Sequence, residues 1–362
     1  MPLHFEARTK PSAKMVWLAP ATALALTAAA AMIVFASAGL DPVQALATFV
    51  LSPLSDWYGV GELLIKATPM ILIGVGLSIG FRAGVWNIGA EGQLTIGAIF
   101  AGYLALRFGP GDGIWVLPSM IVAAVAGGML WAAIPALLRT MFNASEILVS
   151  LMLNYVAQLW LSWLVFGAWR DPAGFNFPQS EPLAPAALLP VIIEGTRANI
   201  SVVFALVAVA LGWILVGRSF VGFQLRVTGL SSGVARYAGF SPHRAVWIGM
   251  FAGGAAAGLA GVGEIAGPLG QIFPTVSSGY GYAAIIVAFL GRLHPVGVLL
   301  SGLLMALIYL GGDSAQMSLG LPSAISGLLQ SLLLFFLLAA DVLVQYRIRY
   351  APRGRSALGA AA

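Results

Sequence analysis

A series of long apolar segments constrains the fold of this chain more than any other feature of its sequence. Each is close to the length of about 20 residues that an α-helix needs to cross a bilayer, whereas a β-barrel would show short segments of alternating polarity. Charged residues make up 9% of the chain, against roughly 25% in a soluble domain. The chain is therefore predicted to be an all-α, polytopic integral membrane protein. The predicted spans are 15–38, 62–81, 86–106, 114–138, 146–166, 198–217, 244–266, 296–312 and 322–344.

Basic residues predict how these spans are threaded. With a shorter apolar piece at 281–291, the chain has about ten transmembrane helices, some of them broken or re-entrant. Lysines and arginines precede the first span and follow the last, so both the N- and C-termini are predicted to be cytoplasmic. The resulting parts are a cytoplasmic N-terminal tail (1–14), a transmembrane domain (15–344) with a cytoplasmic loop (218–243) and an external loop (167–197), and a basic C-terminal tail (345–362).

The first span has an alternative interpretation as a cleaved signal peptide. Ala36-Ser37-Ala38 resembles a small-residue cleavage site. The apolar core of a signal peptide is roughly 7–15 residues long, and segment 15–38 exceeds that length. We therefore expect the segment to be retained as a membrane anchor.

The segment 80–93 places polar side chains among glycines between two apolar runs. Asn87, Glu91 and Gln93 would be costly within a bilayer unless they contact protein, water or a solute. One interpretation is a broken helix whose polar groups line a substrate pathway. The other is that Asn87 and Glu91, at helical i, i+4 spacing, bond to neighbouring helices in the first turns of a span. The sequence leaves both open.

A second interrupted segment runs from 267 to 293. Its density of glycine and proline excludes one continuous helix, and irregular backbone at membrane depth must be buried in protein or line a cavity. We therefore expect a re-entrant element that is the counterpart of 80–93. Paired interruptions of this kind point to a binding site. Its candidate pathway residues are Ser277, Ser278, Tyr280 and Tyr282.

The loop 218–243 contains the signals of a short helix. Ser231 or Ser232 is a candidate N-cap, 233–238 the helix, Gly239 its stop signal, and Pro242 the break before the next span. Such a helix would dock onto a cytoplasmic partner, or alternatively lie on anionic membrane lipid.

Two short matches to catalytic and cofactor motifs, G-x-S-x-G at 76–80 and a relaxed dinucleotide fingerprint at 261–266, are interpreted as small residues that pack helices together. The lysines are Lys10, Lys14 and Lys66, and none follows a glycine, which excludes a Walker A phosphate loop. If ATP drives the protein, another chain must bind it. The 3 histidines are scattered and predict no metal site. The net charge of +5 predicts no nucleic-acid partner, because the basic residues lie between the spans and at both termini.

Several blocks, in a specific order, resemble a known family. Residues 81–84 (Phe-Arg-Ala-Gly) run into 87–93 (Asn-Ile-Gly-Ala-Glu-Gly-Gln). This sequence resembles that of permease subunits of binding-protein-dependent ABC importers, in the branched-chain amino acid, simple sugar and nucleoside superfamily. Within that superfamily it is most similar to general nucleoside permeases. Further matching blocks are 236–239, 278–282, 288–292, 322–324 and 338–341.

The resemblance implies a transport subunit of the cell inner membrane that is not itself an enzyme. Its cargo would be a small polar solute that is moved inward by alternating access, and the resemblance to nucleoside permeases implies a nucleoside. Its partners would be an ATP-binding cassette ATPase, a second homologous permease, an extracytoplasmic solute-binding protein and membrane lipid. The loop residues implied to couple it to the ATPase are Ser231, Ser232, Arg236, Tyr237, Gly239 and Pro242.

The sequence departs from the family's pattern at one place, and it leaves alternatives for the cargo and for the class of transporter. Ser231-Ser232-Gly233 replaces the Asn-Pro type of opening expected for the coupling helix. The cargo alternatives are simple sugars and branched-chain amino acids. An ion-coupled secondary transporter or a channel are the alternatives from other classes, although the chain shows no relay of buried acids of the kind that proton-coupled carriers use.

Overall fold

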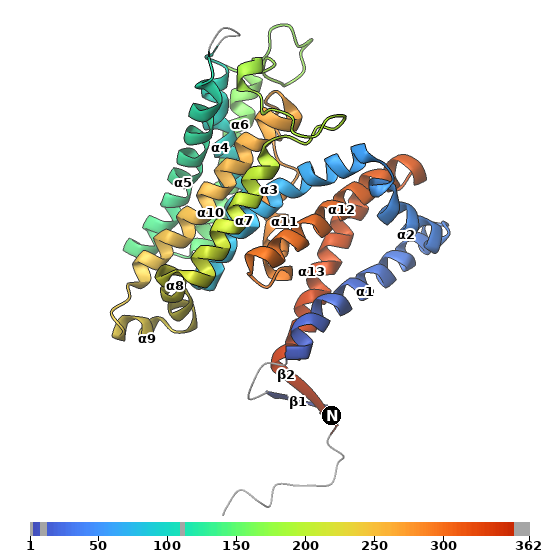
Figure 1. Cartoon of the computed structure of the whole chain (residues 1–362), viewed down its shortest axis with the longest axis vertical. Coiled ribbons are helices and arrows are strands. Elements are labelled where there is room, and N and C mark those ends of the chain that lie inside the picture. Colours follow the sequence, from blue (N-terminus) through green and yellow to red (C-terminus); the bar gives the residue numbers. More distant parts are fainter. Residues whose placement is uncertain (1–2, 8–12, 109–112, 351–362) are drawn as a thin grey trace, which may run out of the picture. The chain divides into compact units, whose positions relative to one another are not determined.

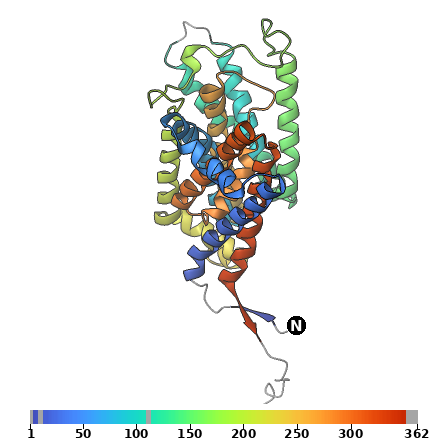
Figure 2. The same ribbon diagram turned by 90° about the vertical axis from the view of Figure 1, so that its right-hand side faces the viewer.

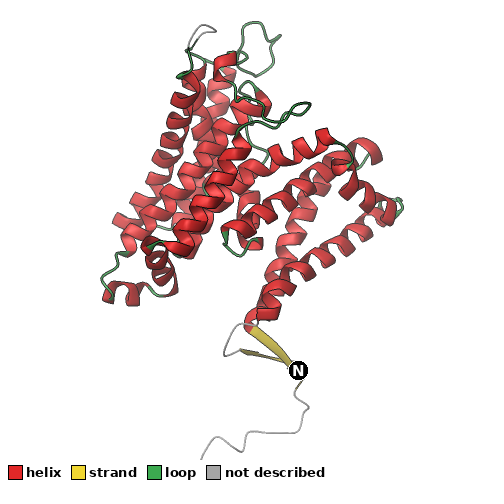
Figure 3. Ribbon diagram, in the orientation of Figure 1, coloured by secondary structure: helices red, strands yellow, loops and turns green. Residues whose placement is uncertain are grey.

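The computed structural model describes residues 3–7, 13–108 and 113–350, and it is helical nearly throughout (Figure 3). It divides into two compact units, each described here by itself. Unit 1 comprises residues 1–50 and 311–362, and unit 2 comprises residues 51–310. The predicted all-α class is confirmed, with one addition in unit 1. The short strands β1 (Leu3–Ala7) and β2 (Tyr346–Tyr350) pair in antiparallel fashion.

Within the described residues, seven helices are long and apolar enough to cross a membrane. This confirms a polytopic protein, while the total of about ten crossings stays a prediction. The seven are α1 (Ala13–Ser37), α3 (Trp57–Arg82), α5 (Val116–Phe142), α6 (Glu146–Phe166), α7 (Ser201–Arg218), α10 (Pro242–Glu264) with the π-helical turn η3 (Ile265–Leu269), and α12 (Pro295–Leu319). The shorter helices at predicted spans are α4 (Ala90–Ala105), α11 (Tyr280–Leu290) and α13 (Ala324–Gln345).

Two helices were not predicted. The helix α2 (Pro42–Leu51) begins where the Asp41 carboxylate accepts from the backbone N–H groups of Val43 and Gln44, and the 3₁₀ turn η1 (Ser52–Leu54) follows it. The helix α8 (Phe220–Leu230) begins at Ser219, whose hydroxyl accepts from the Gly222 N–H at 3.0 Å. Both are too short to register as spans, and their start signals are single capping residues.

Unit 1 contains α1, α2, the end of α12 and α13. The helix α1 packs against α13, and the rings of Phe35 and Phe49 lie 6.2 Å apart. Gly311 permits a close approach to the backbone of Phe49, since a Cβ at that position would overlap its carbonyl oxygen. The helix α12 extends to Leu319, beyond the predicted end at 312, because two glycines and Asp313 lowered the apparent hydropathy of a continuous helix.

Unit 2 is built around α3 and α10. In the most apolar window of α3, 83% of residues are buried inside the protein, and for α10 with η3 the share is 61%, against 22% for α6 and α7. The helix α10 packs against α3, α4 and α5. In Figures 1 and 2 the long helices of this unit run between two opposite ends, one carrying the loop 167–200 and the other carrying α8 and α9 (Ser232–Tyr237).

Candidate functional site

The first interruption separates α3 from α4. Gly84 adopts a left-handed φ of +72°, and residues 85–88 have no regular structure before α4 begins. Asn87 therefore lies before the helix, and the expectation that 86–106 is one span with Asn87 in its first turns is wrong. The physical reason is local, because the Asn87 side chain accepts from the Gly89 N–H at 2.9 Å and so competes with helical bonding.

Asn87 and Gln93 form a reciprocal amide pair across this interruption. The Asn87 Nδ2 donates to the Gln93 Oε1 at 2.9 Å, and the Gln93 Nε2 donates to the Asn87 Oδ1 at 3.1 Å. Each residue is only 1% exposed. The pair holds the irregular backbone against the start of α4, and its role in lining a pathway stays a prediction.

Three polar residues of α6 hold the same segment from outside. Glu146, Ser150 and Asn154 follow each other at i, i+4, i+8 and share one helix face. The Trp86 N–H donates to Glu146 at 3.3 Å and the Ile88 N–H to Ser150 at 3.2 Å. They satisfy backbone groups that lack helical partners in an apolar surrounding. This polar stripe was not predicted, although its i, i+4, i+8 spacing is visible in the apolar run of α6.

Asn154 makes the most contacts of the three. Its Oδ1 accepts from the Gly92 N–H at 2.9 Å, and its Nδ2 donates both to the Ile88 carbonyl and to the Tyr282 hydroxyl at 3.0 Å. Asn154 is 4% exposed. One amide thus connects α6 to the first interruption and to α11.

The second interruption lies between α10 and α11, and its prediction as a non-helical segment is confirmed. The π-helical turn η3 contains Pro268 and a non-helical Gly267, while Gly270 and Gly279 have φ of +65° and +86°. The helix α11 then begins at Tyr280, where the Ser277 hydroxyl accepts from the Tyr280 N–H at 3.1 Å.

The two interruptions meet at Glu91. Its carboxylate accepts from the Gly281 N–H in the first turn of α11 at 2.7 Å. A Cβ at Gly281 would lie 2.6 Å from the Glu91 Cα, so only glycine permits this approach. The structure thus brings together the predicted pathway residues of both segments. The Ser278 carbonyl instead contacts α12, where it accepts from the Tyr309 hydroxyl at 3.3 Å.

The loop predicted to be external is bonded to the second interruption. The Ser180 N–H donates to the Ile272 carbonyl, and the Ile272 N–H donates to the Ser180 hydroxyl, both at 2.9 Å. Arg197 donates twice to Glu62 of α3, at 2.8 and 2.5 Å. The hydrogen bond to Glu62 raises the pKa of Arg197 above its usual value. These contacts fix the loop 167–200 over the end of unit 2 where α10 breaks.

At the other end of unit 2, the predicted short helix is confirmed as α9. The Ser231 hydroxyl accepts from the Val234 N–H at 3.3 Å, which identifies Ser231 rather than Ser232 as the N-cap. Gly239 leaves the helix with a φ of +80°. Pro242 then occupies the first turn of α10, whose N-cap is Ser241.

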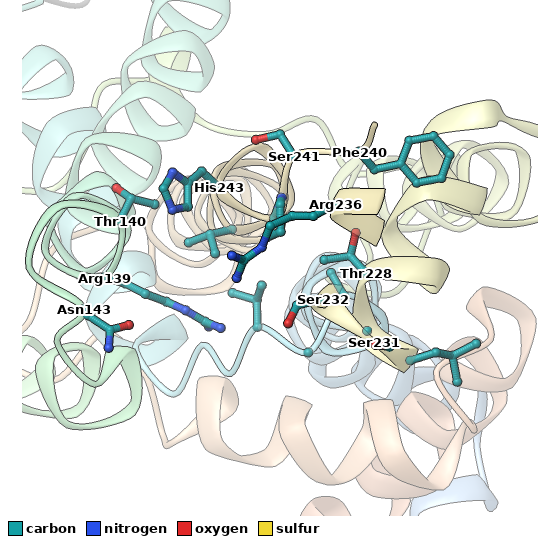
Figure 4. A pocket seen from close by; sticks show the side chains of 17 residues that line it. Arg139, Thr140, Asn143, Thr228, Ser231, Ser232, Arg236, Phe240, Ser241 and His243 are labelled. Atoms are coloured by element: carbon teal, nitrogen blue, oxygen red, sulfur yellow. The ribbon is translucent and has the colours of Figure 1, made fainter. Parts of the chain in front are cut away.

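A cavity of about 750 Å³ lies behind α9, between the ends of α3, α5, α8 and α10. Figure 4 shows the guanidinium groups of Arg139 and Arg236 pointing into the same space. Tyr237 is 99% exposed and is not part of the lining. The predicted coupling residues therefore divide into two sets. Tyr237 and Gly239 lie outside the cavity lining. Those that line the cavity are Ser231, Ser232, Arg236 and Pro242.

These features define a class before any comparison. Membrane-length helices enclose two interrupted, polar segments that meet inside the bundle, and a short exposed helix projects from one end. Among the described residues, no group of histidines or acids is placed to hold a metal ion. The arrangement is that of a membrane transport subunit.

Comparison with known proteins identifies the family. The chain belongs to the family described as branched-chain amino acid transport system / permease component, whose model matches residues 59–338. The glucose ABC transporter permease protein TsgB13 of Haloferax volcanii is 35% identical over 92% of this chain and 90% of its own length. Two guanosine ABC transporter permease proteins of Bacillus subtilis are also similar. NupP is 29% identical over 92% of this chain and 94% of its own length, and NupQ is 28% identical over 65% and 76%.

The family assignment confirms the resemblance found in the sequence. The chain is a multi-pass permease subunit of an ABC importer.

Proposed function

We propose that this permease moves nucleosides inward across the cell membrane by alternating access. The observation that carries the proposal is the meeting of the two interrupted segments at Glu91 in a chain similar to two guanosine permeases. Broken helices expose backbone dipoles and polar side chains to a polar solute within the bilayer. Glu91, Tyr282 and Ser277 are the side chains most directly placed at that junction.

The mechanism assigns different roles to the two ends of unit 2. The end with α8 and α9 faces the cytoplasm together with both termini, and the loop 167–197 faces outward. ATP binding on a partner ATPase displaces α9, and α10 transmits the displacement because its first turn begins five residues after α9 ends. The junction of the two interruptions, at the first turns of α4 and α11, then opens alternately to the two sides.

Three protein partners follow from this proposal. An ATPase docks on α9, and a solute-binding protein delivers cargo to the outer loop. A second homologous permease completes the pathway, since two different Bacillus subtilis permeases that share the guanosine name are both similar to this chain. Membrane lipid covers the remaining apolar surface.

Uptake of labelled guanosine by cells lacking this gene tests the proposal. We expect the wild-type gene to restore uptake, a catalytically dead partner ATPase to abolish it, and a protonophore to leave the ATP-driven component in place. Uptake that survives the dead ATPase but fails with the protonophore would indicate an ion-coupled secondary transporter. Saturable competition by unlabelled nucleosides separates transport from conduction by a channel.

A sugar is the second candidate cargo, favoured by the similarity to the glucose permease TsgB13. Nucleosides and sugars share ring hydroxyls, so a polar pathway accepts either class. Competition of guanosine uptake by glucose distinguishes them. Restoration of glucose uptake alone would replace the proposed cargo while leaving the importer class unchanged.

Docking of the ATPase is expected to depend on the outward face of α9. Val234 and Tyr237 are 61% and 99% exposed, and together they present apolar surface on this helix. Replacing Tyr237 by aspartate should lower ATP-dependent uptake at least tenfold, because aromatic anchors near the centre of an interface commonly contribute about 2 kcal/mol or more. The measurement is uptake together with co-purification of the ATPase.

The matched control for this substitution is Tyr103→Asp. Tyr103 is 46% exposed on α4, where its ring contacts Arg107 and not α9. Both variants should reach the membrane in similar amounts. Equal loss of ATPase binding in the two variants would contradict a docking role for the outward face of α9.

A further inference from the structure

We propose that the cavity behind α9 is a binding site for a phosphate group, carried either by a soluble metabolite or by a lipid headgroup. The cavity has a volume of about 750 Å³, within the range of roughly 300–1,000 Å³ that small-molecule sites occupy. The site is separate from the junction at Glu91 and from the outward face of α9. It does not depend on which solute the permease carries.

The charge of the lining is the first argument. Arg139, Arg236 and His243 line the cavity, and no acidic residue does. Arg139 is already ion-paired with Glu146, which lies outside the lining. Among the described residues, the guanidinium group of Arg236 has no hydrogen-bond or ion-pair partner. A guanidinium group that faces a second arginine across a cavity without an acid favours occupation by an anion.

The lining also supplies neutral donors. Ser231 and Ser241 accept backbone N–H groups at the starts of α9 and α10, and each hydroxyl still carries an O–H donor. Ser232, Thr140 and Asn143 add further polar groups to the wall. Donors therefore surround the cavity from three helices.

This donor set matches a phosphate group better than a carboxylate. A phosphate presents three or more acceptor oxygens, whereas a carboxylate presents two, and planar guanidinium groups bind phosphate oxygens in pairs. Two arginines and several hydroxyls from different directions would leave donors unused around a carboxylate. A phosphate would use the Arg236 guanidinium together with hydroxyl donors from different directions.

A phosphate in this cavity would connect the coupling helix to the transmembrane bundle. Arg236 belongs to α9, Arg139 lies in the last turn of α5, and His243 lies in the first turn of α10. Glu146 accepts both from Arg139 and from the Trp86 N–H of the first interruption. A bound anion would thus hold α9 against the helices that carry the proposed pathway, and its concentration would regulate coupling.

Binding is testable with the full-length chain purified in maltoside detergent without its ATPase, so that no ATPase nucleotide site contributes. The probes are inorganic phosphate, guanosine monophosphate and, in a separate arm, added phosphatidylglycerol. We expect at least one probe to bind in calorimetric titration and to slow backbone hydrogen exchange over 231–243. Protection by the soluble probes identifies a metabolite site, and protection by the lipid alone identifies a headgroup site.

The variant Arg236→Gln should weaken binding roughly tenfold or more, because hydrogen bonds between charged groups are among the stronger ones. The matched control is Arg244→Gln, which removes the same charge from the first turn of α10 but outside this cavity. Equal weakening in both variants would reveal only general attraction of anions to a basic surface. That result, or no binding of any probe to the wild type, would overturn the proposal without bearing on guanosine uptake.

Discussion

Replacement of Asn154 by leucine is expected to destabilise the protein and abolish uptake. Leucine has a similar size but leaves the Gly92 N–H, the Ile88 carbonyl and the Tyr282 hydroxyl without the partner that they have in Asn154. Hydrogen bonds between membrane helices contribute about 0.6 kcal/mol on average, and orphaned buried groups cost about 1–3 kcal/mol each. The loss of three contacts at a 4% exposed position should therefore lower the free energy of unfolding by about 2–4 kcal/mol.

The functional loss should exceed what this destabilisation alone explains. Asn154 joins both interruptions, so its removal uncouples α11 from the segment before α4. The measurements are the midpoint of thermal unfolding in detergent and guanosine uptake at matched amounts of membrane protein. The control is Gln158→Leu, which removes an amide one turn further along α6 at an exposed position.

The control variant should behave as the wild type. If Asn154→Leu left both the unfolding midpoint and uptake unchanged, the polar stripe of α6 would not hold the interrupted segments. If it lowered stability but spared uptake, Asn154 would be a structural residue without a part in the pathway.

The interrupted segments were predictable because their signals are local. Glycine and proline at 267–282 exclude one continuous helix, and polar residues among glycines at 80–93 favour a broken helix as one of two interpretations. The cap residue Ser231 and the stop signal Gly239 likewise located α9 within a residue. In each case the decisive interactions lie within a few positions of one another.

The partners of these segments were not predictable in the same way. Asn154 and Tyr282 are separated by 128 positions, and Gly281 and Glu91 by 190. Their pairing depends on the packing of whole helices, which hydropathy does not encode. The same limit applies to Arg236 and Tyr237, which are neighbours in sequence, although one lines a cavity and the other faces away from it.

Neither the local sequence signals nor the packing of the helices identifies the cargo. Backbone groups at a helix break and a few polar side chains recognise polar solutes in general, so similar chains can serve guanosine and glucose, as the names of the relatives indicate. Under the proposed function, selectivity depends on the partners that deliver the solute. The permease sequence constrains the class of solute through the polarity of its interrupted segments.

Replacement of Gly254 by valine is expected to lower stability by disrupting the packing of two helices. The helix α10 crosses α5 in direct backbone contact, and a Cβ at Gly254 would lie 2.5 Å from the Gly128 carbonyl oxygen and 2.8 Å from the Ala132 Cβ. Neither neighbour is the end of a flexible side chain, so the two helices must separate. Overpacking of this kind costs about 1–3 kcal/mol or more, and association in the bilayer depends on such close packing of small residues.

The Gly254→Val substitution should also disturb the second interruption, because α10 is central to unit 2 and leads directly into that segment. We expect a lower unfolding midpoint, reduced accumulation in the membrane, and no uptake even when expression is raised. The matched control is Gly217→Val in α7, where a Cβ would have nothing within 4 Å. Both substitutions add the same side chain to a helical glycine, so propensity effects are shared. Equal losses in the two variants would show that packing between α5 and α10 does not limit stability.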